Sequence, residues 1–136
     1  MRLRIPEDLP TAWVMADGEL LTRVFQNVVS NCLRYAGEEV EVSLKVKGEW
    51  AEIWVEDDGP GIASELLPHI FDRFYKGENG KFGLGLSIVK AGMEYMGGTA
   101  GVENKSAPLH GAVYRLGLPV HHGVALNLED MTAAAE

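Results

Sequence analysis

The sequence of 136 residues has a single cysteine, Cys32, and lacks any run of about 18 apolar residues. One cysteine excludes an intramolecular disulfide, and the missing apolar run excludes a membrane-spanning helix in this stretch. The net charge of −8 disfavours a nucleic-acid-binding surface, because such a surface needs a basic face. Apolar residues make up 46% of the chain and charged residues 24%, as in globular domains. We therefore expect one domain with no nucleic-acid partner and no direct membrane contact.

The spacing of apolar residues predicts helices alternating with strands. Apolar side chains recur every three or four positions over residues 19–35, which is typical of an amphipathic helix, and Asp17 is a suitable N-cap. The same period returns over residues 84–96. Strands are predicted over residues 40–46, 50–55, 99–104 and 111–118, extended chain over 3–16, and short helices near 65–67 and 128–135. This order favours an α/β fold in which helices cover one face of a mixed sheet.

The predicted first helix carries a polar stripe of Asn27, Asn31, Arg34 and Tyr35. Their spacing places all four on nearly one helix face. Amide oxygens are suitable Mg²⁺ ligands, and an arginine one turn later is suited to a phosphate. Taken alone, the stripe is equally typical of the polar edge of a surface helix.

A glycine-rich loop, Asp57 to Ile62, directly follows an apolar strand. A carboxylate at a strand end can accept a hydrogen bond from an exocyclic amine such as that of adenine, and the glycines let the backbone approach a flat base. Aspartate, glycine and proline also form ordinary turns, so the loop by itself leaves both interpretations open.

A second glycine-rich segment, residues 80–90, leads straight into the other predicted helix. Backbone N–H groups at a helix N-terminus bind anions, although the segment is neither a Walker A loop nor a dinucleotide fingerprint. Just before it, Phe71 to Lys76 combines paired aromatics with two basic residues, which fits either a phosphate-contacting segment or a plain hydrophobic anchor. Residues 71–90 contain four basic and two acidic side chains, and this local positive charge in an acidic chain indicates a phosphate site.

These four segments, in this order and spacing, resemble the N, G1, F and G2 boxes of sensor histidine kinases over roughly residues 10–120. The resemblance implies a two-layer α/β sandwich, the Bergerat fold shared with gyrase, the Hsp90 chaperones and MutL, with ATP and Mg²⁺ as cofactors. It implies that Asp57 binds the adenine amino group, that Asn31 and Asn27 hold the metal, and that residues 63–83 form an ATP lid that is mobile until nucleotide binds. The nucleotide-binding residues it implies are Asn27, Asn31, Arg34, Tyr35, Asp57, Gly59, Gly61, Ile62, Arg73, Lys76, Lys81, Gly83, Leu84, Gly85 and Leu86.

Asn27 discriminates between branches of the resembled superfamily. Its hydrolytic members and the related serine kinases usually carry a glutamate base there, whereas an asparagine cannot take a proton at neutral pH. The resemblance then implies transfer of the γ-phosphoryl group to a histidine on a separate dimerisation domain, and onward to a response regulator. A free-standing ATPase or serine kinase, and a non-catalytic nucleotide-sensing module, stay as alternatives.

The four histidines, His69, His110, His121 and His122, do not sit on a predicted helix before an acidic residue, so we expect none to be the phosphoacceptor. We expect residues 1–120 to form the catalytic domain and residues 121–136 a tail of unknown role. We also expect a cytoplasmic monomer with a buried Cys32. We expect the chain to be part of a longer protein, either anchored in the membrane or free of it.

Overall fold

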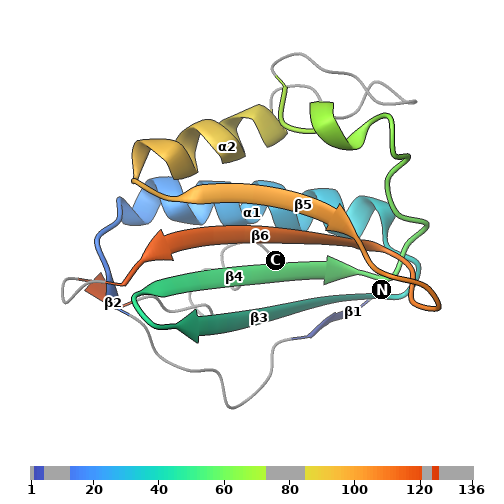
Figure 1. Ribbon diagram of the computed structural model, residues 1–136, viewed down its shortest axis with the longest axis horizontal. Helices are drawn as coiled ribbons and strands as arrows, with labels where there is room; N and C mark the ends of the chain where they lie inside the picture. The colour runs from blue at the N-terminus through green and yellow to red at the C-terminus, as the bar shows by residue number, and fades with distance from the viewer. Residues whose placement is uncertain (1, 5–12, 73–84, 121–123, 126–136) are drawn as a thin grey trace.

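The computed structural model describes residues 2–4, 13–72, 85–120 and 124–125. A five-stranded sheet has the order β1-β3-β4-β6-β5, in which β1 runs parallel to β3 and every other neighbouring pair is antiparallel. Its strands are β1 (Arg2–Arg4), β3 (Glu39–Lys47), β4 (Trp50–Asp57), β5 (Thr99–Asn104) and β6 (Ala112–Pro119). Two helices, α1 (Gly18–Tyr35) and α2 (Gly85–Tyr95), lie on one face of this sheet (Figure 1). The predicted mixed α/β sandwich is confirmed.

Helix α1 forms where the amphipathic period predicts it. Asp17 is its N-cap, and the Asp17 carboxylate accepts a hydrogen bond from the Leu20 N–H at 3.1 Å. Its buried side chains are Leu21, Val24, Phe25, Val28, Val29, Asn31 and Cys32. Cys32 is fully buried, as expected. The buried asparagine is the exception in this apolar set, and it lies near the end of the helix that faces the cavity described below.

The strands β3 and β4 show why one polar side chain lies deep in the molecule. Alternation buries Ala51, Ile53, Val55 and Asp57 on the helix-covered face of β4. The carboxylate of Asp57 therefore continues the row of core residues at the point where the strand ends.

Helix α2 crosses α1 at short range. A Cβ on Gly92 would lie 2.8 Å from Cγ2 of Val24, so only glycine allows this approach. Leu86, Val89 and Met93 bury the same side of α2 in the core. The close packing fixes the first residue of α2, Gly85, beside the polar stripe of α1.

The remaining elements are short. A 3₁₀ helix, η1 (Leu67–His69), lies just after the short helix expected near residues 65–67. Strands β2 (Trp13–Val14) and β7 (Val124–Ala125) pair with each other in a small second sheet, which attaches part of the expected tail to the domain. The helix expected over residues 128–135 lies outside the described residues.

Candidate nucleotide-binding site

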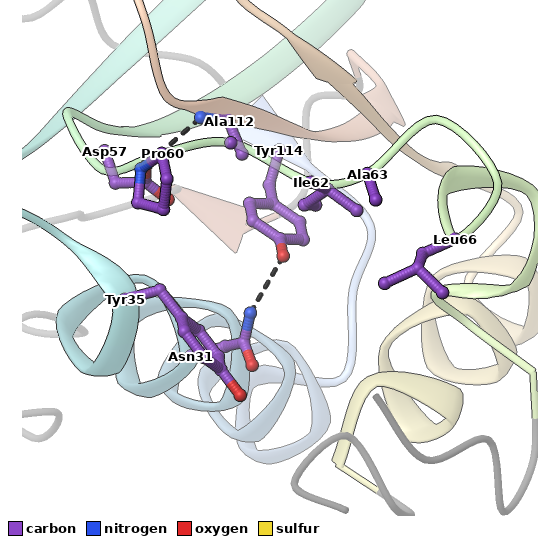
Figure 2. Close-up of a pocket in the computed structure, with 10 residues that line it drawn as sticks. Asn31, Tyr35, Asp57, Pro60, Ile62, Ala63, Leu66, Ala112 and Tyr114 are labelled. Carbon is purple, nitrogen blue, oxygen red and sulfur yellow. Dashed lines mark hydrogen bonds between the residues drawn. The ribbon is translucent and has the colours of Figure 1, made fainter. Parts of the chain in front are cut away.

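A cavity of about 270 Å³ opens between the end of α1, the end of β4, the start of β6 and the loop after β4 (Figure 2). Its lining residues are Asn31, Tyr35, Asp57, Pro60, Gly61, Ile62, Ala63, Leu66, Ala112 and Tyr114. Most of this wall is apolar, and the polar groups stand at two places, Asp57 on one side and Asn31 with Tyr114 on the other. The volume is near the lower end of the roughly 300–1,000 Å³ of small-molecule sites, which suits a flat heterocycle.

Asp57 is 5% exposed, so its carboxylate must find partners inside the protein. Its Oδ1 accepts hydrogen bonds from the N–H of Gly59 at 3.0 Å and of Ala112 at 3.1 Å. The two donors fix the carboxylate at the cavity wall, and no cation is paired with it among the described residues. A ligand N–H group can therefore supply a further donor to this acceptor.

The loop that follows Asp57 is held in place by residues from β5 and the segment before β6. Asn104 pairs with both backbone groups of Ile62, accepting from its N–H at 2.8 Å and donating to its oxygen at 2.7 Å. Nδ1 of His110 lies 3.0 Å from the oxygen of Gly59. Gly61 has a φ of +83°, and a Cβ there would approach Oδ1 of Asn104 to 2.9 Å. The loop is thus a fixed wall of the cavity, and position 61 requires glycine.

Both asparagines of the polar stripe use their amide nitrogens within the protein. Nδ2 of Asn31 donates to the hydroxyl of Tyr114 at 2.8 Å, and Nδ2 of Asn27 donates to the oxygen of Gly85 at 3.2 Å. Since an amide has one donor end and one acceptor end, the oxygens are the atoms left for a ligand. Amide oxygens are hard donors of the kind that Mg²⁺ takes, so the two residues fit that metal.

Two neighbours of Asp57 have shifted pKa values. Burial raises the pKa of the Cys32 thiol well above its usual range, and the neighbouring Asp57 carboxylate raises it further. Asp58 points elsewhere and accepts hydrogen bonds from the N–H groups of residues 37–39 at 2.9 to 3.1 Å. These bonds, led by those of Glu39 and Glu38, lower the pKa of Asp58.

The cavity brings together five of the predicted site residues: Asn31, Tyr35, Asp57, Gly61 and Ile62. Gly59 is buried next to them, with its ideal Cβ position 2.2 Å from the oxygen of Tyr35. Arg34 is exposed on the last turn of α1 and does not line the cavity. The side chain of Leu86 is 2% exposed and packs in the core, so only its backbone N–H can meet a ligand. Arg73, Lys76, Lys81, Gly83 and Leu84 lie outside the described residues.

Tyr114 is a cavity residue that the motifs do not identify. Its position on β6, paired with Val55, puts it on the helix-covered face, where it is 1% exposed. A buried tyrosine needs a partner for its hydroxyl, and this requirement is the signal that could have drawn attention to it. The pattern of one strand does not identify that partner, which comes from α1.

No helix in the described part of the chain combines the length and the apolar character needed to cross a membrane.

Residues 16–122 match the family described as histidine kinase-, DNA gyrase B- and HSP90-like ATPase. The sensor protein RstB of Escherichia coli is 40% identical over 114 residues, which cover 79% of this chain and 26% of RstB. The solved structure of the mycobacterial sensor histidine kinase MprB superposes with a TM-score of 0.75 at 28% identity, covering 88% of this chain and 82% of that one. Full-length ShkA in complex with AMPPNP superposes with a TM-score of 0.77 at 25% identity, covering 90% of this chain and 26% of ShkA. The chain thus spans about a quarter of the length of RstB.

Proposed function

The chain belongs to the family of histidine kinase-, DNA gyrase B- and HSP90-like ATPases, and from this premise we propose that it is the ATP-binding catalytic domain of a sensor histidine kinase. In this proposal it binds ATP with Mg²⁺ and delivers the γ-phosphoryl group to a histidine on a separate dimerisation domain. A response regulator then receives the phosphoryl group from that histidine. A cytoplasmic location, where ATP is available, goes with this function.

The observation that carries the proposal is the buried carboxylate of Asp57 in an otherwise apolar wall. Adenine is a flat heterocycle with an exocyclic amine. Its faces suit the apolar side chains of Ile62 and Leu66, and its amine suits Asp57. Guanine has a carbonyl oxygen at the equivalent position, and this oxygen would face the carboxylate with its lone pairs. The wall therefore favours adenine.

The phosphates would extend from the base toward α1 and the start of α2. Asn31 and Asn27 would hold Mg²⁺ through their amide oxygens, and the metal would neutralise charge on the phosphates. Backbone N–H groups in the first turn of α2, which begins at Gly85, would meet the phosphates, since a helix N-terminus binds anions. We include Arg34 and the basic residues Arg73, Lys76 and Lys81 of the sequence prediction as phosphate contacts in this proposal.

Asn27 determines the fate of the γ-phosphoryl group. Its amide donates to Gly85 and cannot accept a proton, so this side chain supplies no base for activating water. The domain would hold the γ-phosphoryl group in line with an imidazole nitrogen from outside, the P–N bond forming as the bond to ADP breaks.

Calorimetric titration of the domain with non-hydrolysable analogues of ATP and GTP tests this proposal. We expect the ATP analogue to bind, Mg²⁺ to tighten its binding, and the GTP analogue to bind at least about 10-fold more weakly, since one lost hydrogen bond to a charged group has this effect. Absence of binding at millimolar nucleotide, or equal binding of both analogues, would contradict the assignment of the base to Asp57.

A second measurement separates a kinase from an ATPase. The domain alone, incubated with ATP and Mg²⁺, should release little phosphate. Addition of a helical dimerisation domain that carries the acceptor histidine should give an acid-labile phosphoprotein. Rapid phosphate release by the domain alone would instead favour a hydrolytic member of the family.

A further inference from the structure

Tyr114 joins the strand β6 to the polar stripe of α1 inside the cavity. Its hydroxyl accepts the hydrogen bond of Asn31 Nδ2 at 2.8 Å, as the dashed line in Figure 2 shows. The two residues are 83 positions apart in the sequence, and both are buried, Tyr114 to 1% and Asn31 to 7% exposure. A buried hydrogen bond between side chains of two layers is a specific arrangement, because each group would be left without a partner if the other moved.

We propose that Tyr114 is a positioning residue, which holds the amide of Asn31 so that its oxygen is presented to a divalent cation. The inference rests on the proposed function, in which Asn31 is a metal ligand. It adds a residue that none of the four sequence boxes contains.

The geometry of an amide is the first argument. Oδ1 and Nδ2 of Asn31 lie on opposite sides of the same planar group, so a bond that holds Nδ2 against Tyr114 turns Oδ1 away from it. Mg²⁺ demands near-ideal octahedral geometry and binds oxygen. A metal-binding side chain that rotates freely must be ordered when the metal binds, and this ordering weakens the affinity. The hydrogen bond to Tyr114 orders Asn31 before the metal binds, so this cost is smaller.

The rigidity of Tyr114 itself is the second argument. The ring of Phe71 packs edge-on against the ring of Tyr114, with centroids 6.5 Å apart and an angle of 78° between the planes. On the strand, Tyr114 pairs with Val55 of β4. The hydrogen-bond acceptor for Asn31 is therefore fixed in place.

Asn27 is held in the same way as Asn31, by a hydrogen bond from its amide nitrogen. Its Nδ2 is held by the oxygen of Gly85 at 3.2 Å, a backbone group that no side-chain substitution removes. Asn31 instead depends on a side-chain hydroxyl. The orientation of Asn31 can thus be altered by changing one atom of Tyr114.

The test is the affinity of a non-hydrolysable ATP analogue, measured by calorimetry in EDTA and across a Mg²⁺ titration, for wild type and Tyr114→Phe. Phenylalanine keeps the ring and its contact with Phe71 and removes only the hydroxyl. We expect the EDTA affinity to stay within about 2-fold, and the apparent Mg²⁺ affinity of the nucleotide complex to fall by about 10- to 100-fold, the usual range for losing a partner of a metal ligand. Tyr95→Phe removes the same atom from a tyrosine that is 81% exposed at the end of α2, and it should change neither quantity.

A double-mutant comparison makes the role of Asn31 explicit. In an Asn31→Ala background, Tyr114→Phe should have no further effect on Mg²⁺ affinity, because the amide on which it acts is gone. The inference is overturned if Tyr114→Phe weakens binding equally in EDTA and Mg²⁺, if it leaves the Mg²⁺ affinity unchanged, or if its effect persists without Asn31. Failure of the wild type to bind nucleotide at all would overturn the proposed function first, and this inference with it.

Discussion

Two hollows of similar volume lie at the end of β4, and their chemistry is opposite. The inner hollow is the candidate nucleotide-binding cavity of about 270 Å³, which is lined mostly by apolar side chains around the buried Asp57. The outer one, of about 250 Å³, is lined by Glu38, Glu39, Glu41, Glu56, Asp58 and Lys105. Asp57 and Asp58 are neighbours in sequence, yet their side chains point to opposite faces of the sheet, because successive residues of extended chain alternate between faces. Asp57 points toward the helices and Asp58 away from them.

Surroundings, and not the carboxylate itself, distinguish the proposed binding group, Asp57, from the structural one, Asp58. Asp58 receives N–H groups from three consecutive residues and closes the turn between α1 and β3. Asp57 receives two N–H groups on a single oxygen and faces an apolar cavity. The carboxylates of the outer hollow are already solvated or hydrogen-bonded, so a ligand would add little to them. The carboxylate of Asp57 has little access to water, so a hydrogen-bond donor from a ligand would stabilise it more.

The largest expected effect comes from exchanging Asp57 for asparagine, with the same exchange at Asp58 as its control. Asp57→Asn keeps an oxygen to accept from Gly59 and Ala112, but places an NH₂ group against the adenine amine. We expect about a 100-fold loss of ATP-analogue affinity by calorimetry, the size of a lost hydrogen bond to a charged group. Asp58→Asn should bind within about 2-fold of wild type, since it lies outside the inner cavity. Equal losses in the two variants would erase the proposed distinction between the hollows.

A smaller effect is expected from the loop that forms the inner wall. Gly61→Ala introduces a side chain at a φ of +83° and within 2.9 Å of Asn104 Oδ1. Gly48→Ala is its control, because Gly48 has a φ of +61° with nothing near its Cβ position. Left-handed backbone costs roughly 1–2 kcal/mol in either variant, measured by urea unfolding. Only Gly61→Ala should also weaken nucleotide binding; a matching loss in Gly48→Ala would show that binding follows global stability alone.

The sequence predicts most of the fold and one side of the site because both depend on local periods. The alternation in β4 and the three-to-four spacing in α1 suffice to place Asp57 at a strand end and Asn31 on a helix stripe. The helix predicted over residues 19–35 and the strand over 99–104 agree with α1 and β5. Motif position, however, does not separate backbone from side chain, so the sequence predicts Leu86 as a binding residue although its side chain lies in the core.

Contacts between distant strands and helices are what local patterns cannot provide. Ala112 donates to Asp57 across 55 positions, and Asn104 holds Ile62 across 42. The residues of these contacts are unremarkable in their own segments. Their partners are determined by the sheet order, in which β4 lies next to β6 and β6 next to β5.

A pH-dependent effect distinguishes the outer aspartate in a different way. The backbone N–H groups hold the pKa of Asp58 below its ordinary value of 3.8, so its contribution to stability is present above that pH and is lost as pH falls toward the lowered pKa. The urea midpoint of wild type should therefore exceed that of Asp58→Asn at pH 6, and the gap should narrow below about pH 4. A gap that is the same at pH 3 and pH 6 would contradict an ionised Asp58 as the acceptor.

The smallest effect tests whether water reaches the buried side chains around Asp57. Burial, together with Asp57, raises the pKa of the Cys32 thiol above its ordinary value of 9.0. The thiol of the unfolded chain therefore ionises at lower pH than the thiol of the folded protein. The stability contributed by the neutral, buried thiol is complete below pH 9 and is lost as pH rises. Wild type should lose up to about 1.4 kcal/mol per pH unit above pH 9 relative to Cys32→Ala, measured by urea unfolding. Tyr114 is present in both proteins, and its own loss begins only above pH 10, the ordinary value for a phenol, so the difference between them from pH 8 to 10 reports on the thiol. A stability difference between the two proteins that does not change over that interval would mean that water reaches Cys32. Asp57 would then already be solvated, and the inner hollow would lose the property that sets it apart from the outer one.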